Sequence, residues 1–381
     1  MSPKRLLFSC FYAFFLCGIV MLTLGSALPD ISTAHNLTYS LSGALLSCYS
    51  LGNLASGILS GLAVLYLGPK TAAVILTLCI CAGMSGLTFA DTPMLLMVSC
   101  GLVGFGRGSL ITFSQAMVSL ADSRPSTTGL LHAAFAAGAI LAPLVFSALR
   151  VISWRTGLVF VAGLGLIAAG LFALVRDYPG REGSSGRSLA FLRERGFIMI
   201  AGLMFLYLCC EFALNGWLVS YMTHKRMSMT YAQSMAALLW VVMLAGRLAC
   251  AHLMKHVSRE KLLVVLAGGA AIFFGVMLNS ESRAGVALSV AGLGAFMSGI
   301  SPLIYASAAP YSNKYPLAMG VIFTVGCTGG TLMPLLTGII AERFGFDGGM
   351  SAIMSAFVML TVLAVLSCRY RKDDVNCNGV I

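Results

Sequence analysis

Apolar segments of about 20 residues alternate with short polar connections along almost the whole chain, and about 20 residues is the length that an α-helix needs to cross a bilayer. The pattern predicts an all-α membrane protein with twelve transmembrane helices. We expect these helices over residues 6–28, 41–67, 71–90, 94–120, 127–149, 156–175, 197–222, 231–254, 261–279, 285–309, 318–341 and 348–368.

Residues 101–145 recur 191 positions later without a gap. The two copies are identical at Gly101, Leu102, Phe105, Gly108, Pro125, Gly129, Gly138, Leu141, Pro143 and Leu144, paired with Gly292, Leu293, Phe296, Gly299, Pro316, Gly320, Gly329, Leu332, Pro334 and Leu335. Glycine and proline mark close helix packing and bends, so the copies share backbone shape as well as hydrophobicity. The repeat predicts two pseudo-symmetric six-helix bundles, an architecture typical of secondary transporters that work by alternating access.

Composition and charge support a membrane protein. Hydrophobic residues make up 59% of the chain and charged residues 10%, whereas a soluble domain carries about 25% charged residues. The formal charge of +11 comes from short loops, so it indicates membrane topology and not a nucleic-acid partner. Of the 24 Lys and Arg residues, 16 fall on the side that holds both termini and 6 on the other, which predicts cytoplasmic termini.

The longest polar connection predicts the boundary between the two bundles. It covers residues 176–196 and is rich in Gly, Ser and charge, as linkers are. We expect an N-terminal bundle over 1–175, a cytoplasmic linker over 176–196, a C-terminal bundle over 197–368 and a cytoplasmic tail over 369–381. The 12 cysteines lie in apolar segments without metal-ligand spacing, and they are interpreted as small buried hydrophobes.

Glu211 is the one acidic residue predicted near the middle of a membrane span. Tyr207, Asn215 and Tyr221 share its helix face at about 100° per residue, which predicts a polar cavity wall. Ionisable groups within a bilayer are costly, so Glu211 is the candidate for proton coupling and its three neighbours are candidates for substrate binding. The alternative is a structural carboxylate bonded within its own bundle.

Arg107 lies midway along its predicted span, with Gln115 on nearly the same face. A guanidinium binds a carboxylate or phosphate through two parallel hydrogen bonds, so both residues are substrate-binding candidates. The alternative is that Arg107 packs against helix carbonyls and stabilises the fold. Ser298 and Tyr305 share a face of the helix over 285–309 and would add hydrogen-bonding groups, although serine in membrane helices also serves in packing.

Arg247 is predicted nearer the cytoplasmic end of its helix, and its counterpart in the first bundle is Asn53. The segments around the two residues resemble each other, and we interpret both residues as gating positions. Direct contact of Arg247 with the substrate is the alternative.

Three stretches resemble a known family. GILSGLAVLYLGPKT contains Gly61, Gly68 and Lys70 where the major facilitator superfamily has its glycine and basic signature, which implies a gating role for them. Residues 129–143 and 206–222 resemble helices 5 and 7 of the fucose:proton symporter branch, which takes up neutral sugars. In that superfamily helices 1, 4, 7 and 10 line the central cavity, so the resemblance implies that Arg107 and Glu211 face each other.

We therefore expect a secondary active transporter for a small polar or anionic organic solute: a sugar, a sugar acid or another organic acid. The expected partners are the solute, protons and membrane lipids, with no cofactor, metal or nucleic acid, in a monomer of the bacterial cytoplasmic membrane. No catalytic motif is present, which argues against an enzyme. An efflux pump for amphipathic compounds is the second interpretation, and a receptor or a lipid-handling enzyme is a third.

Overall fold

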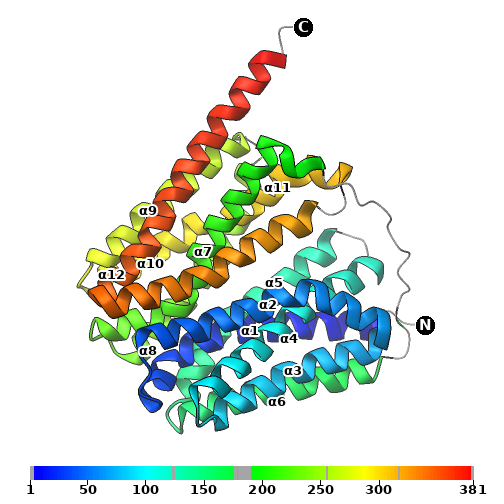
Figure 1. Cartoon of the computed structure of the whole chain (residues 1–381), viewed down its shortest axis with the longest axis vertical. Coiled ribbons are helices and arrows are strands. Elements are labelled where there is room, and N and C mark those ends of the chain that lie inside the picture. Colours follow the sequence, from blue (N-terminus) through cyan, green and yellow to red (C-terminus); the bar gives the residue numbers. More distant parts are fainter. Residues whose placement is uncertain are drawn as a thin grey trace.

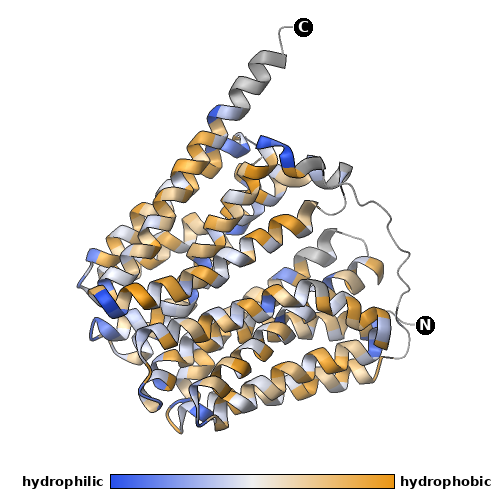
Figure 2. Ribbon diagram, in the orientation of Figure 1, coloured by the Kyte–Doolittle hydropathy of each residue, from blue (hydrophilic) through white to orange (hydrophobic). Residues whose placement is uncertain are grey.

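The computed structural model describes residues 4–121, 125–175, 178, 190–254, 256–315 and 318–378. Its helices are α1 (Lys4–Ala34), α2 (Tyr39–Leu67), α3 (Pro69–Phe89), α4 (Pro93–Ala121), α5 (Pro125–Leu149), α6 (Trp154–Ala173), η1 (Ala190–Arg193), α7 (Arg195–His224), α8 (Met229–Leu253), α9 (Arg259–Asn279), α10 (Arg283–Met297), α11 (Ile300–Lys314) and α12 (Ala318–Asn378). Figure 2 shows that apolar residues cover these helices along most of their length, with polar residues at their ends.

The helices do not correspond one to one with the predicted spans. The predicted span 285–309 is formed by two helices, α10, which ends at Met297, and α11, which begins at Ile300, and Arg283–Tyr311 together is long and apolar enough to cross a membrane. The last two predicted spans are the arms of α12, which bends at Gly345, where φ is 79° and ψ is 166°. Such a positive φ suits glycine because a Cβ would clash there. Among the described residues, ten helical segments are long and apolar enough to cross a membrane, or eleven if α2 forms one span across its 49° bend, so a count of twelve stays a prediction.

Helix α1 begins and helix α6 ends at the same end of the helix array (Figure 1). We call it the inner end because the sequence predicts that it is cytoplasmic, and we call the opposite end the outer end. Hydroxyl side chains cap helices that begin at the outer end: Thr38 for α2, Ser228 for α8 and Ser282 for α10. Each accepts a hydrogen bond from a backbone N–H of the first turn, which otherwise has no partner within the helix.

The helices form two groups (Figure 1). Helices α1–α6 lie together in the lower part of the view, and α7–α12 lie together in the upper part. The groups repeat a close contact between main chains. A Cβ added to Gly138 of α5 would overlap the carbonyl oxygen of Phe15 on α1, and a Cβ added to Gly329 of α12 would overlap that of Phe205 on α7. Gly138 and Gly329 are one of the identical pairs of the sequence repeat.

The two groups are packed together at their outer ends. The backbone N–H of Ser40 donates to Oε2 of Glu342 at 3.0 Å, and the ring of Tyr39 lies 4.9 Å from that of Phe346. Deeper along the same seam, a Cβ on Gly43 would lie 2.6 Å from the carbonyl oxygen of Pro334, so main chains meet there.

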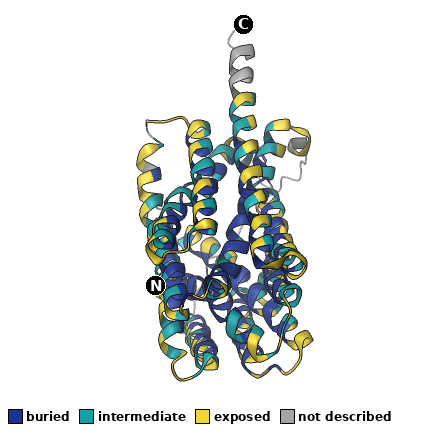
Figure 3. Ribbon diagram, turned by 90° about the vertical axis from the view of Figure 1, so that its left-hand side faces the viewer, coloured by how far each residue is buried: buried dark blue, intermediate teal, exposed yellow. Residues whose placement is uncertain are grey.

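The inner ends differ. In Figure 1, α2 and the first arm of α12 lie close together at the outer end and diverge toward the inner end. Buried residues concentrate in the middle of the array (Figure 3). The arrangement is closed outside and diverges inside.

Candidate functional site

Arg107 is buried halfway along α4, between helices of the first group. Its Nε donates to the carbonyl oxygen of Cys17 at 3.3 Å, and its Nη1 donates to Oδ1 of Asn53 at 3.0 Å. The guanidinium also lies over the rings of Tyr49 and Phe135, at 5.9 and 5.6 Å from their centroids. Helices α1, α2 and α5 therefore hold the side chain, and the protein itself satisfies part of its hydrogen-bonding capacity.

Glu211 is buried on α7 in the second group, with 9% of its surface exposed. Its Oε1 accepts a hydrogen bond from the hydroxyl of Tyr207, one turn earlier, at 3.0 Å. Among the described residues it forms no ion pair with an arginine, so the resemblance's implication of a facing Arg107 does not extend to direct contact in this conformation. The positive charge that acts most strongly on the Glu211 carboxyl is that of Arg247, followed by that of Arg107.

Arg247 extends from α8 toward the boundary between the two groups. Its guanidinium lies over the ring of Trp240, 5.7 Å from the centroid. Its charge acts on Glu211 of its own group and on His132 of α5 in the first group. Its Nε is buried and makes no hydrogen bond to the protein. The gating role expected for Arg247 stays a prediction, and its charge also acts on the buried acid Glu211.

Near the middle of the helices, a hydrogen bond and a ring contact connect the two groups. Nδ2 of Asn53 donates to Sγ of Cys327 on α12 at 3.7 Å, and the rings of Phe135 and Trp240 lie 6.0 Å apart. Because Arg107 lies over Phe135 and Arg247 over Trp240, the two guanidinium groups flank a pair of aromatic rings at the interface. Sequence analysis selected neither ring nor Cys327, since an apolar side chain within an apolar span carries no periodic or compositional signal.

Three further candidates lie close to these residues. Oδ1 of Asn215 accepts from Nε1 of Trp240 at 3.2 Å, which ties α7 to α8. Tyr305 of α11 lies near enough to Glu211 for their charges to interact. Ser298 is buried, donates to the carbonyl oxygen of Ala295 at 2.6 Å and packs against Gly246, beside Arg247.

The structure does not bring Gln115 and Tyr221 into this group. Gln115 is exposed, eight residues beyond Arg107 on α4, or about 12 Å along the helix axis. Tyr221 lies ten residues beyond Glu211, or about 15 Å, and its hydroxyl donates to Oδ1 of Asp347 at 2.9 Å near the outer end. Gln115 shares a helix face with Arg107, and Tyr221 shares one with Glu211. Each nevertheless lies too far along its helix axis to reach the central residues.

The signature between the second and third helices lies at the inner end. Gly68 has a φ of 77°, ends α2 and begins α3, and its N–H donates to the carbonyl oxygen of Val64 at 3.1 Å. Lys70 is exposed, and a Cβ on Gly61 would meet no atom within 4 Å. The gating role of these residues stays a prediction. Lys255, from the corresponding segment of the second repeat, lies outside the described residues, as do Pro316 and most of the linker over 176–196.

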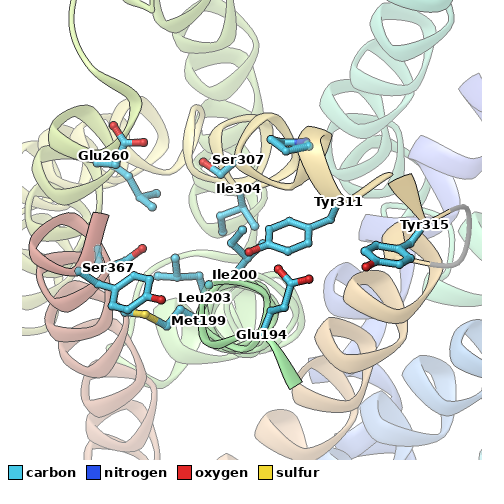
Figure 4. A pocket seen from close by; sticks show the side chains of 15 residues that line it. Glu194, Met199, Ile200, Leu203, Glu260, Ile304, Ser307, Tyr311, Tyr315 and Ser367 are labelled. Carbon is cyan, nitrogen blue, oxygen red and sulfur yellow. The ribbon is translucent and has the colours of Figure 1, made fainter. Parts of the chain in front are cut away.

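A separate cavity of about 340 Å³ opens at the inner end of the second group (Figure 4). The carboxylates of Glu194 and Glu260 lie at its rim, and Tyr311 extends across it between α11 and α7. None of the predicted site residues lines it. We therefore treat the central residues, and not this cavity, as the candidate solute site.

Comparison with known proteins identifies the class. Residues 10–282 match the family model described as Major Facilitator Superfamily, and the chain belongs to that superfamily of multi-pass membrane transporters. Protein TsgA of Escherichia coli O1:K1 is 24% identical to this chain over 394 residues, with 97% of each protein covered. The resemblance to the major facilitator superfamily is thereby confirmed.

Solved structures agree on the fold. The crystal structure of the nucleoside transporter NupG matches with a TM-score of 0.78 and 13% identity, covering 97% of this chain and 98% of that one. The D-xylose-proton symporter matches with a TM-score of 0.78 and 14% identity, covering 96% and 97%. A bacterial homologue of the human lysosomal transporter Spinster, in an inward-facing and occupied conformation, matches with a TM-score of 0.77 and 15% identity, covering 97% and 98%.

Proposed function

We propose that this protein is a secondary active transporter that moves a small polar or anionic organic solute by alternating access, driven by protons. The observation that carries the proposal is that one buried acid and two arginines lie within their helices, close to where Asn53 contacts Cys327 and Phe135 contacts Trp240 across the two helix groups. Charged groups inside a membrane protein are costly to bury, and they mark substrate or ion pathways.

The closed outer seam and the divergent inner ends support a carrier in its inward-facing state. In this proposal the two helix groups are the pseudo-symmetric bundles of residues 1–175 and 197–368, with twelve spans in total and both termini in the cytoplasm. Rocking one bundle against the other would separate Gly43 from Pro334 at the outer seam and open the centre to the outside. The repeated contacts of Gly138 and Gly329 support that symmetry.

Two arguments bear on the solute. Two fold relatives, a D-xylose-proton symporter and a nucleoside transporter, are named for small polar substrates. The resemblance of residues 129–143 and 206–222 to the fucose:proton symporter branch also favours a neutral sugar. Against this, the described centre holds the guanidinium groups of Arg107 and Arg247 and one carboxylate, Glu211, so positive charge is in excess. An organic acid fits this balance better than an uncharged sugar.

Glu211 is the group that carries the coupling proton in this proposal. Its carboxyl accepts a hydrogen bond from Tyr207 and is influenced by the positive charge of Arg247, and both interactions would change when the bundles move. A carboxyl whose surroundings alternate between two states binds its proton more tightly in one state than in the other. Such a swing links proton movement to solute movement.

The test is Glu211→Gln, which keeps the shape of the side chain and removes its titration. In proteoliposomes with a pH gradient, the variant should no longer accumulate solute, but it should still exchange labelled for unlabelled solute at a rate near that of the wild type. Glu194→Gln, at the rim of the separate cavity, is the matched control and should accumulate normally. Accumulation by the Glu211 variant would return Glu211 to a structural role.

A further inference from the structure

We propose that Arg247 is the residue that binds the anionic group of the solute, and that Glu211 is the acid whose proton accompanies it. This inference rests on the proposed transport function and names the substrate class, an organic acid with a single carboxylate. It differs from the expectation drawn from the sequence, in which Arg107 held the substrate and Arg247 served as a gate.

The two arginines differ in how much of their hydrogen-bonding capacity the protein uses. A guanidinium has five N–H donors. Arg107 directs Nε to the carbonyl oxygen of Cys17 and Nη1 to Asn53, both within its own group. For Arg247 no hydrogen bond is recorded among the described residues, and its Nε is buried without a partner. A buried donor without a partner costs about 1–3 kcal/mol, and an incoming carboxylate would relieve that cost.

Arg247 interacts electrostatically with residues of both helix groups. Its charge acts on Glu211 of α7 and on His132 of α5, which belong to different groups. A ligand bound there touches the surface along which the groups separate. Phe135 and Trp240 form an aromatic surface beside the guanidinium, which suits the flat or apolar side of an organic acid.

Charge balance explains how proton and anion would travel together. Without solute, Arg107, Arg247 and ionised Glu211 sum to one positive charge. When a monocarboxylate binds to Arg247 and a proton neutralises Glu211, the sum is again one positive charge. The other titratable groups facing Glu211 are Tyr207 and Cys210 on α7, Tyr305 on α11 and Cys327 on α12, and His132 faces Arg247. Binding of an anion with its proton therefore avoids the electrostatic cost of binding either alone, and each favours the other.

The experiment compares binding and transport by the purified full-length protein in lipid nanodiscs and proteoliposomes. The probes are D-glucuronate, D-galacturonate and L-lactate, each tested against the neutral compounds D-glucose, D-galactose and glycerol. The proposal expects at least one acid to raise the melting temperature of the wild type. Arg247→Gln should lower the affinity for that acid at least tenfold, and Arg247→Lys should lower it less, because the charge remains but the two-pronged geometry is lost.

Two further variants sharpen the result. Arg155→Gln is the matched control, because Arg155 also lies over a tryptophan, Trp154, at 4.7 Å, but outside the centre; it should leave the affinity unchanged. Glu211→Gln should bind the acid at least as tightly as the wild type, with an affinity that no longer depends on pH. Each variant is first checked for a single gel-filtration peak, and Arg247→Lys serves if Arg247→Gln does not fold.

Three outcomes would overturn the inference: no acid binds to the wild type, a folded Arg247→Gln keeps its affinity, or Arg107→Lys loses more affinity than Arg247→Lys. Transport of a neutral sugar that is insensitive to Arg247 would refute the inference and leave the transport function standing. Absence of flux for acids and neutral compounds alike would count against the transport function itself.

Discussion

The two arginines at the centre occupy related places in the sequence repeat but sit on exchanged helices. In the first group the guanidinium comes from α4, as Arg107, and α2 supplies its partner Asn53. In the second group the position related to Asn53 is Arg247 on α8, and the position 191 residues after Arg107 is Ser298. The two repeats therefore share backbone shape but carry their arginine on different helices, α4 in the first group and α8 in the second. One guanidinium is tied into its own bundle, whereas the other keeps a buried donor free.

The largest expected effect is on folding stability, and it separates the two arginines. Arg107→Leu removes donors from the Cys17 carbonyl and from Asn53, and hydrogen bonds of charged groups contribute about 1.5–3 kcal/mol each. We expect the free energy of unfolding to fall by about 2–4 kcal/mol, measured by denaturant titration in detergent. Arg247→Leu, which loses no recorded hydrogen bond, should cost less than about 1 kcal/mol. An equal loss for both variants would contradict the distinction between a tied and a free guanidinium.

A smaller effect tests the platform beneath Arg247. Trp240→Phe keeps an aromatic ring, weakens the cation–π contact and removes the N–H that donates to Asn215. We expect the affinity for the organic acid to fall about fivefold, or about 1 kcal/mol. Trp154→Phe changes the equivalent platform beneath Arg155 and should leave the affinity as it is. Isothermal titration calorimetry measures the affinity of both variants for the acid. Equal losses of affinity would show that Trp240 contributes no more to binding than Trp154.

The smallest effect concerns Ser298, the repeat counterpart of Arg107. Its hydroxyl bonds within its own turn, to the carbonyl oxygen of Ala295, so its removal leaves no distant group without a partner. Ser298→Ala should change both stability and affinity by less than about 0.5 kcal/mol. A loss of affinity comparable with that of Trp240→Phe would indicate that the Ser298 hydroxyl contacts the solute. It would contradict the interpretation that this position, which lacks the charge of Arg107, takes no part in binding.

The sequence predicted an all-α membrane protein and an acid within a span, Glu211, which is buried in α7, because both follow from simple rules. Length and hydropathy define membrane helices, and Glu211 stands out as an acid inside one of them. The hydrogen bond between Arg107 and Asn53 could not be predicted from the sequence. Helical periodicity indicates which residues share a face, but not which neighbouring helix that face contacts. The same limit explains Tyr221, which shares the face of Glu211 yet bonds to Asp347 far along the axis. Trp240 carried no sequence signal, because a tryptophan in an apolar span resembles any packing residue.

The outer seam also has an electrical consequence. The main chain of Gly43 lies close against that of Pro334, which leaves no room for water between these two segments. In the proposed inward-facing carrier, the membrane potential would fall mainly across this outer seam, and Glu211 and Arg247 would lie on its inner side. Moving one elementary charge through 100 mV corresponds to about 2.3 kcal/mol. A solute anion that crosses with its proton carries no net charge, so the voltage across the membrane would neither drive nor oppose its passage.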